Sequence, residues 1–109
     1  NILVLVNGDL HKVALTDFGL AATTGAGQPP LMARCGTRGY MAPEMVACGS
    51  GREHILQFLP RNGAPVVTAI RAYSETSGYG QSVDMWSAGV VLFEWLIGKL
   101  YFIDTELID

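Results

Sequence analysis

Two side chains that carry oxygen atoms bracket the N-terminal stretch of the chain. Asn1 precedes the apolar run ILVLV, and a second, half-apolar run ends at Asp17, which Phe18 and Gly19 follow. Turn residues 7–9 (Asn-Gly-Asp) separate the two runs, so the pattern predicts a β-hairpin. Folding back at this turn would bring Asn1 and Asp17 to the same open end. The sequence therefore places an amide and a carboxylate, distant along the chain, near each other.

The composition limits the classes of protein that need consideration. The 109 residues make one domain at most, or a piece of one, and a hydrophobic content of 50% excludes a disordered chain. A net charge of −3 gives no electrostatic reason to expect binding to nucleic acid or to an anionic membrane. Cys35 and Cys48 fit neither a disulfide framework nor a metal cluster, so we expect a reducing compartment. The apolar start lacks a basic flank, so we expect no signal peptide.

The clearest helix signal runs from Ser82 to Gly98. Ser82 suits an N-cap, Asp84 lies where the helix dipole favours a negative charge, and Gly98 suits the C-terminal cap. Apolar residues cover nearly every direction of this helix, so it has to be enclosed, and we expect further protein to cover it. The stretch 83–102 approaches the length of a membrane span, but interrupting charges favour a buried core helix instead.

The middle of the chain gives weaker signals. Pro43 and Glu44 predict the first turn of a short helix. Residues 20–34 have no usable periodicity and are expected to form an irregular loop. Residues 49–78 contain HILQFLP and VVTAI, either of which fits a short strand or a helix turn. We expect disorder or loose packing in that region. His54 has no constellation of ligands around it in the sequence and is expected at the surface.

Three motifs, in the expected order along the chain, resemble the eukaryotic protein kinase family. Asn1 and a strand pair ending in Asp17-Phe18-Gly19 resemble the catalytic-loop asparagine and the Asp-Phe-Gly motif. GTRGYMAPE, at residues 36–44, resembles the end of the activation segment in the serine/threonine-specific branch. DMWSAG, at residues 84–89, resembles the start of the central helix of the large lobe. One tripeptide recurs by chance, whereas three motifs in order are highly specific.

The resemblance implies a role for each residue of the N-terminal stretch. In the family, the residues that match Asn1 and Asp17 hold Mg²⁺ ions that bridge the phosphates of ATP. Phe18 would pack inward and set the direction of the aspartate, and Gly19 would let the chain turn into the mobile segment. The alternative for Asp17 is a plain turn residue after a strand. The aspartate that accepts the substrate proton would lie before Asn1, so no catalytic base is expected within the chain.

The resemblance also assigns positions further along the chain. Thr37 and Tyr40 lie in the stretch that faces the peptide substrate in the family. Glu44 would form a buried ion pair with a later arginine, or remain a solvated acid in a first turn. Asp84 would brace the catalytic loop, or only complement the helix dipole. The positions expected in the core on either interpretation are Trp86 and Trp95.

The expected fold class is α+β: a mostly helical piece of the kinase large lobe, with an N-terminal β-hairpin, an activation segment and a central buried helix. This partial kinase domain divides into the metal-binding hairpin with Asp-Phe-Gly (1–19), the activation segment (20–44), an expected insertion (49–78) and the region of the central helix (79–109). The insertion is either a surface loop or sequence retained from non-coding material.

The sequence thus predicts part of a serine/threonine protein kinase, which uses Mg²⁺ and ATP to phosphorylate Ser/Thr hydroxyls of proteins. We expect the chain alone to be inactive, because the family's glycine-rich loop, strand lysine and catalytic aspartate do not occur in it. A pseudokinase acting as a scaffold or regulatory binding module is the alternative. We expect an intracellular location, in cytoplasm or nucleus, with no membrane span and no nucleic-acid partner. We also expect the isolated chain to fold poorly.

Overall fold

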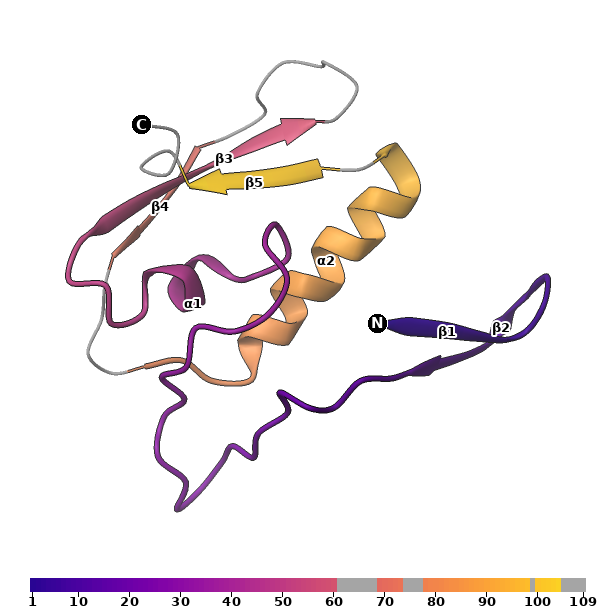
Figure 1. Cartoon of the computed structure of the whole chain (residues 1–109), viewed down its shortest axis with the longest axis horizontal. Coiled ribbons are helices and arrows are strands. Elements are labelled where there is room, and N and C mark those ends of the chain that lie inside the picture. The colour runs from indigo at the N-terminus through magenta and orange to yellow at the C-terminus, as the bar shows by residue number, and fades with distance from the viewer. Residues whose placement is uncertain (61–68, 74–77, 99, 105–109) are drawn as a thin grey trace.

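The computed structural model describes residues 1–60, 69–73, 78–98 and 100–104. Seven elements follow one another along the chain (Figure 1). They are β1 (Ile2–Val6), β2 (Asp9–Leu15), α1 (Pro43–Ala47), β3 (Glu53–Pro60), β4 (Ala69–Tyr73), α2 (Ser82–Ile97) and β5 (Leu100–Asp104).

The predicted hairpin is confirmed. Strands β1 and β2 pair in antiparallel fashion, with Ile2 opposite Leu15 and a bulge between Val4 and Val6. Gly8 in the turn has φ of +82°, a left-handed conformation that glycine adopts without a steric penalty. In Figure 1 the hairpin projects away from the rest of the chain, and most of its described side chains are exposed.

A second sheet forms the other half of the structure. Its strands have the order β4-β3-β5, and both neighbouring pairs are antiparallel. Leu56 of β3 and Ala72 of β4 pack with Ala47 of α1 and Val90 of α2 into one buried cluster. The two helices therefore cover the face of the sheet that carries Leu56, as Figure 1 shows.

A second buried cluster lies next to the first. It joins residues 42–48 to the start of α2, and its buried members are Ala42, Cys48, Tyr79 and Val83. Trp86 is half-buried and packs against both clusters. Trp95 is 67% exposed, and the expectation for that residue is wrong within the described part of the chain.

The expectation of loose packing in residues 49–78 is wrong for the part of this region that the structure describes. HILQFLP lies within β3, and of VVTAI only Ala69 and Ile70 lie in the described residues, in β4. His54 is 0% exposed rather than at the surface. The period of two along β3 explains this, because it places His54 on the same face as buried Leu56. The described strands also contain more residues than the described helices, so "mostly helical" is wrong.

Helix α2 has the predicted extent but not the predicted burial. Gly98 is its C-terminal cap, with φ of +113°, whereas the N-cap is Gln81 and Ser82 is already helical. Only Val83 and Val90 of this helix are buried. Large apolar side chains on its other sides are exposed, namely Met85, Leu92, Trp95, Leu96 and Ile97. Within the described residues α2 is therefore not enclosed, and its cover by further protein stays a prediction.

The membrane alternative has no support in the described residues. None of their helices combines the length and the apolar character that crossing a bilayer demands. Helix α2, the longest of them, has 16 residues.

Candidate functional site

The open end of the hairpin brings together the two residues that sequence analysis paired. The Asn1 side-chain amide donates a hydrogen bond to Oδ2 of Asp17, with 3.2 Å between nitrogen and oxygen. The backbone N–H of Thr16 donates to the carbonyl of Asn1 at 3.0 Å. Both side chains are exposed, so a ligand can reach them from solvent. The predicted juxtaposition of amide and carboxylate is confirmed.

The backbone at Asp17 directs this carboxylate. The strand register pairs Ile2 with Leu15, which places Asn1 beside Thr16 but leaves Asp17 outside the ladder. Asp17 then adopts φ of +66°, the only left-handed conformation at a non-glycine residue among those described. Such a conformation costs about 1 kcal/mol or more at a residue with a Cβ, although aspartate tolerates it better than most. Backbone strain at this position is typical of functional sites.

Two neighbours of Asp17 differ from expectation. Phe18 is 67% exposed, so it does not pack inward, since no described residue covers it. Gly19 was expected to make the turn after the motif, but it lies outside the left-handed region, which Asp17 occupies instead. A Cβ atom added at Gly19 would lie 3.7 Å from Oδ1 of Asp17, an ordinary contact. The change of chain direction therefore depends on Asp17 more than on Gly19.

The donor set at the hairpin end fits a hard divalent cation. Turning the Asn1 carboxamide over would place its oxygen, in place of its nitrogen, beside the Asp17 carboxylate. Mg²⁺ commonly takes one or two protein oxygens and completes its shell with phosphate and water. Among the described residues no group of three or more His, Cys, Asp or Glu side chains could hold a metal by themselves. The Asn1–Asp17 pair thus fits a cation that arrives together with a phosphate ligand.

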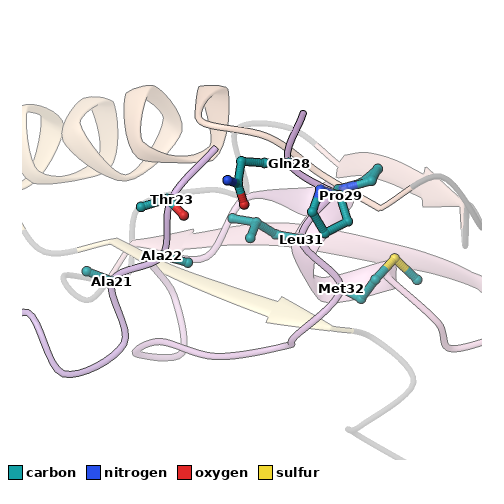
Figure 2. Close-up of a pocket in the computed structure, with 8 residues that line it drawn as sticks. Ala21, Ala22, Thr23, Gln28, Pro29, Leu31 and Met32 are labelled. Atoms are coloured by element: carbon teal, nitrogen blue, oxygen red, sulfur yellow. The ribbon is translucent and has the colours of Figure 1, made fainter. Parts of the chain in front are cut away.

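The segment after the hairpin is an exposed loop with one open depression. Residues 20–30 are exposed throughout. A depression of about 680 Å³ opens there, and Figure 2 shows the side chains around it. Thr23 and Gln28 provide the only polar side chains of its lining, and the others are alanine, proline, leucine and methionine. Such a lining does not make a phosphate-binding loop.

The residues expected to face a substrate occupy a turn that α2 holds in place. The N–H of Tyr40 donates to the carbonyl of Thr37 at 3.1 Å, and Thr37 is exposed. Ser87 of α2 donates through its hydroxyl to the carbonyl of Tyr40 at 2.7 Å. The Tyr40 hydroxyl donates to the carboxylate of Glu94. The side chain of Tyr40 therefore points to α2, while Thr37 is accessible.

Sequence analysis missed Ser87 and Glu94 as partners of this turn. A signal was present, because Glu94 is a carboxylate near the end of an otherwise apolar helix. A carboxylate among apolar side chains has to bind a polar partner or reach solvent. Its partner could not be identified from sequence, because it lies 54 residues away.

Comparison with curated proteins finds relatives over most of the chain. The phosphorylase b kinase gamma catalytic chain (liver/testis isoform) of Mus musculus is 33% identical over 91 residues, which is 84% of this chain. CBL-interacting serine/threonine-protein kinase 24 of Arabidopsis thaliana is 33% identical over 107 residues, or 98% of this chain. The chain is related to the serine/threonine protein kinases.

The kinase relatives are much longer than this chain. It spans 17% of each of the two relatives named above. Serine/threonine-protein kinase RAD53 of Saccharomyces cerevisiae is 33% identical over 102 residues, which is 94% of this chain and 10% of that kinase. No family model matches the chain, and neither does any solved structure.

Two further positions assigned from the kinase resemblance lie at helix starts. Glu44 is exposed in the first turn of α1, which Pro43 opens as predicted. Asp84 is exposed in the first turn of α2. A negative charge in either place complements the helix dipole. The geometry thus agrees with the simpler alternative for each residue, and the roles that the family implies for them stay predictions.

Proposed function

We propose that this chain is part of a serine/threonine protein kinase that transfers the γ-phosphoryl group of ATP to serine or threonine hydroxyls of proteins. The contact between Asn1 and Asp17 at 3.2 Å carries the proposal. The kinase names of its relatives support it. Intact metal ligands favour an enzyme over a scaffold, which has no need of both.

The proposed roles follow from the chemistry of the side chains. The oxygen atoms of Asn1 and Asp17 would hold Mg²⁺. When bound there, the ion would supply positive charge that offsets the charge of the phosphoryl group. Thr37 and Tyr40 belong to the surface that positions the peptide substrate. We assign no general base to a described residue, because the resemblance implies an aspartate that precedes Asn1.

The proposal also covers the partners of the protein and its location in the cell. ATP, Mg²⁺ and a protein with an accessible serine or threonine are the expected partners. We further propose an intracellular location, in the cytoplasm or nucleus. Cys35 and Cys48, both free thiols, support a reducing compartment.

A matched pair of variants in the full-length protein tests the metal assignment. Asp17→Asn removes the proposed ligand. Asp9→Asn changes a carboxylate of the same hairpin that accepts only a local bond, from the N–H of His11 at 3.0 Å. The assays are transfer of labelled γ-phosphate to protein and binding of Mn²⁺, a paramagnetic substitute for Mg²⁺, followed by electron paramagnetic resonance in the presence of ATP.

The expected results separate the two carboxylates. Asp17→Asn should lower phosphoryl transfer by about a hundredfold or more and weaken Mn²⁺ binding, as for loss of a preorganised electrostatic group. Asp9→Asn should behave as the wild type. Equal transfer by Asp17→Asn and the wild type would contradict the proposal. A full-length protein that binds Mg²⁺-ATP but transfers no phosphate would favour the scaffold alternative.

A further inference from the structure

A short stretch of the loop, Pro30–Ala33, is held against the residues that precede α2. We call this stretch the strap. Leu31 and Tyr79 form an isolated antiparallel bridge, in which each N–H donates to the other carbonyl, at 3.1 Å and 2.9 Å. Tyr79 is only 8% exposed and belongs to the second buried cluster. Backbone and side chain of Tyr79 are thus both engaged.

Side-chain contacts extend this attachment along the strap. The Tyr79 hydroxyl donates to the carbonyl of Ala33, and the Cys48 thiol donates to the carbonyl of Met32 at 3.5 Å. Burial of the ring, and next the nearby Cys35, raise the pKa of Tyr79 above its ordinary value of 10.0. Because even the ordinary pKa of tyrosine lies far above neutral pH, the hydroxyl keeps its proton there and can donate.

The strap ends a few residues before the turn that carries Thr37. Beyond that turn, Tyr40 is tied to α2 through Ser87 and Glu94. Residues 34–39 therefore lie between two attachments, one to Tyr79 and Cys48 and the other to α2. A chain this short between two fixed points has little freedom, so loosening one attachment displaces the residues between them.

We propose that Tyr79 is a positioning residue for the protein substrate of the proposed kinase: it holds the strap, and through the strap the backbone around Thr37. The inference rests on the proposed function, because it needs a phosphoryl acceptor at that turn. Tyr79 itself touches neither substrate nor nucleotide in this role. Its hydroxyl acts through Ala33, whereas Asp17 lies at the far end of the loop.

The test compares two variants of the full-length protein that each lose one hydroxyl donor to a backbone carbonyl. Tyr79→Phe removes the bond to Ala33 and keeps the ring. Ser50→Ala removes local bonds in which no strap residue takes part: the Ser50 hydroxyl donates to the carbonyl of Arg52 at 3.2 Å and accepts from the N–H of Arg52 at 3.4 Å. KM for a serine-centred synthetic peptide library, KM for ATP and kcat are measured, together with hydrogen exchange at the amide of Leu31.

The test depends on whether Tyr79→Phe changes the KM for peptides without changing the KM for ATP. Tyr79→Phe should raise KM for the peptides between about twofold and tenfold, the range expected for one hydrogen bond, with KM for ATP unchanged. Exchange at Leu31 should accelerate by a similar factor, and Ser50→Ala should leave all four quantities unchanged. An active Tyr79→Phe variant with wild-type peptide KM, or with equal changes in both KM values, would overturn the inference and leave the kinase assignment standing.

Failure of the proposed function gives a different pattern. If the wild type transfers no phosphate to any peptide, the kinase proposal fails, and the positioning role fails with it. Unchanged exchange at Leu31 in Tyr79→Phe would by itself overturn the inference, because the hydroxyl would then not hold the strap.

Discussion

Gly78 lies against the strap with no room for a side chain, which makes Gly78→Ala a sharp test of the packing. A Cβ atom added there would lie 2.5 Å from the carbonyl oxygen of Leu31, 2.8 Å from Sδ of Met32 and 2.9 Å from Cβ of Pro30. All three distances are shorter than real contacts to a Cβ atom. In addition, Gly78 has φ of +77°, in the left-handed region that favours glycine.

The cost follows from these contacts. The carbonyl of Leu31 has to retreat by roughly 0.8 Å to reach an ordinary C···O separation of about 3.3 Å. That movement disrupts both hydrogen bonds of the bridge to Tyr79, each worth about 1 kcal/mol. The left-handed backbone adds about 1 kcal/mol for alanine. We therefore expect Gly78→Ala to lower the free energy of unfolding by about 3 kcal/mol.

Gly51→Ala is the matched control. Gly51 has nearly the same backbone angle, φ of +75°, but nothing lies within 4 Å of its added Cβ atom. It should lose only the conformational part, about 1 kcal/mol. Urea unfolding of the full-length protein gives the two free energies, and hydrogen exchange at the amides of Leu31 and Tyr79 shows where protection is lost. Equal destabilisation by the two variants, with the bridge still protected in Gly78→Ala, would refute the reasoning.

Further outcomes follow from other contacts. Leu56→Ala truncates a side chain that is 2% exposed and should lower the free energy of unfolding, measured in urea, by about 2–5 kcal/mol. Leu20→Ala, at a residue that is 69% exposed, should change it by no more than about 0.5 kcal/mol. Tyr40→Phe removes the donor to Glu94 and should lower the unfolding free energy by about 1–2 kcal/mol, with a smaller loss in Glu94→Gln, which keeps an acceptor. Because the pKa of Tyr79 is raised in the folded state, the folded protein holds this proton more tightly than the unfolded chain. The contribution of this proton to the free energy of unfolding is fully present below pH 10.0 and is lost as the pH rises through the pKa of Tyr79 in the folded protein. The urea midpoint should therefore fall less steeply above pH 10.0 in Tyr79→Phe than in the wild type.

The hairpin could be predicted from the sequence because its determinants are local. Two strand-forming runs on either side of an Asn-Gly turn fix the register, and the register alone decides that Asn1 lies beside Thr16. The pairing of Asn1 with Asp17 follows from it. The left-handed backbone of Asp17 could not be foreseen, because the glycine two residues later was the more obvious place for a turn.

The strap and the three-stranded sheet could not be predicted, for a different reason. The contacts of Tyr79 with Leu31 and Ala33 join segments more than forty residues apart. No sequence pattern near either segment predicts that the two pair. The strand of His54 carries a histidine at a core position, where period-two analysis would place an apolar residue. His54 is buried because helices cover that face of the sheet. Their position depends on contacts between segments that are distant in the sequence.

Two kinds of contact therefore hold the two ends of the candidate site. The proposed metal ligands, Asn1 and Asp17, depend on a ladder between adjacent strands, which forms from neighbouring residues and projects away from the core (Figure 1). The turn of Thr37 depends on distant anchors, Tyr79 before α2 and Glu94 within it. Hydrogen bonds between distant segments break when the core loosens, whereas the pairing of two adjacent strands is less sensitive to loosening of the core. The proposed cation binding and the proposed substrate positioning can thus fail separately, so a change in the KM for peptide alone would be an informative signature of the strap.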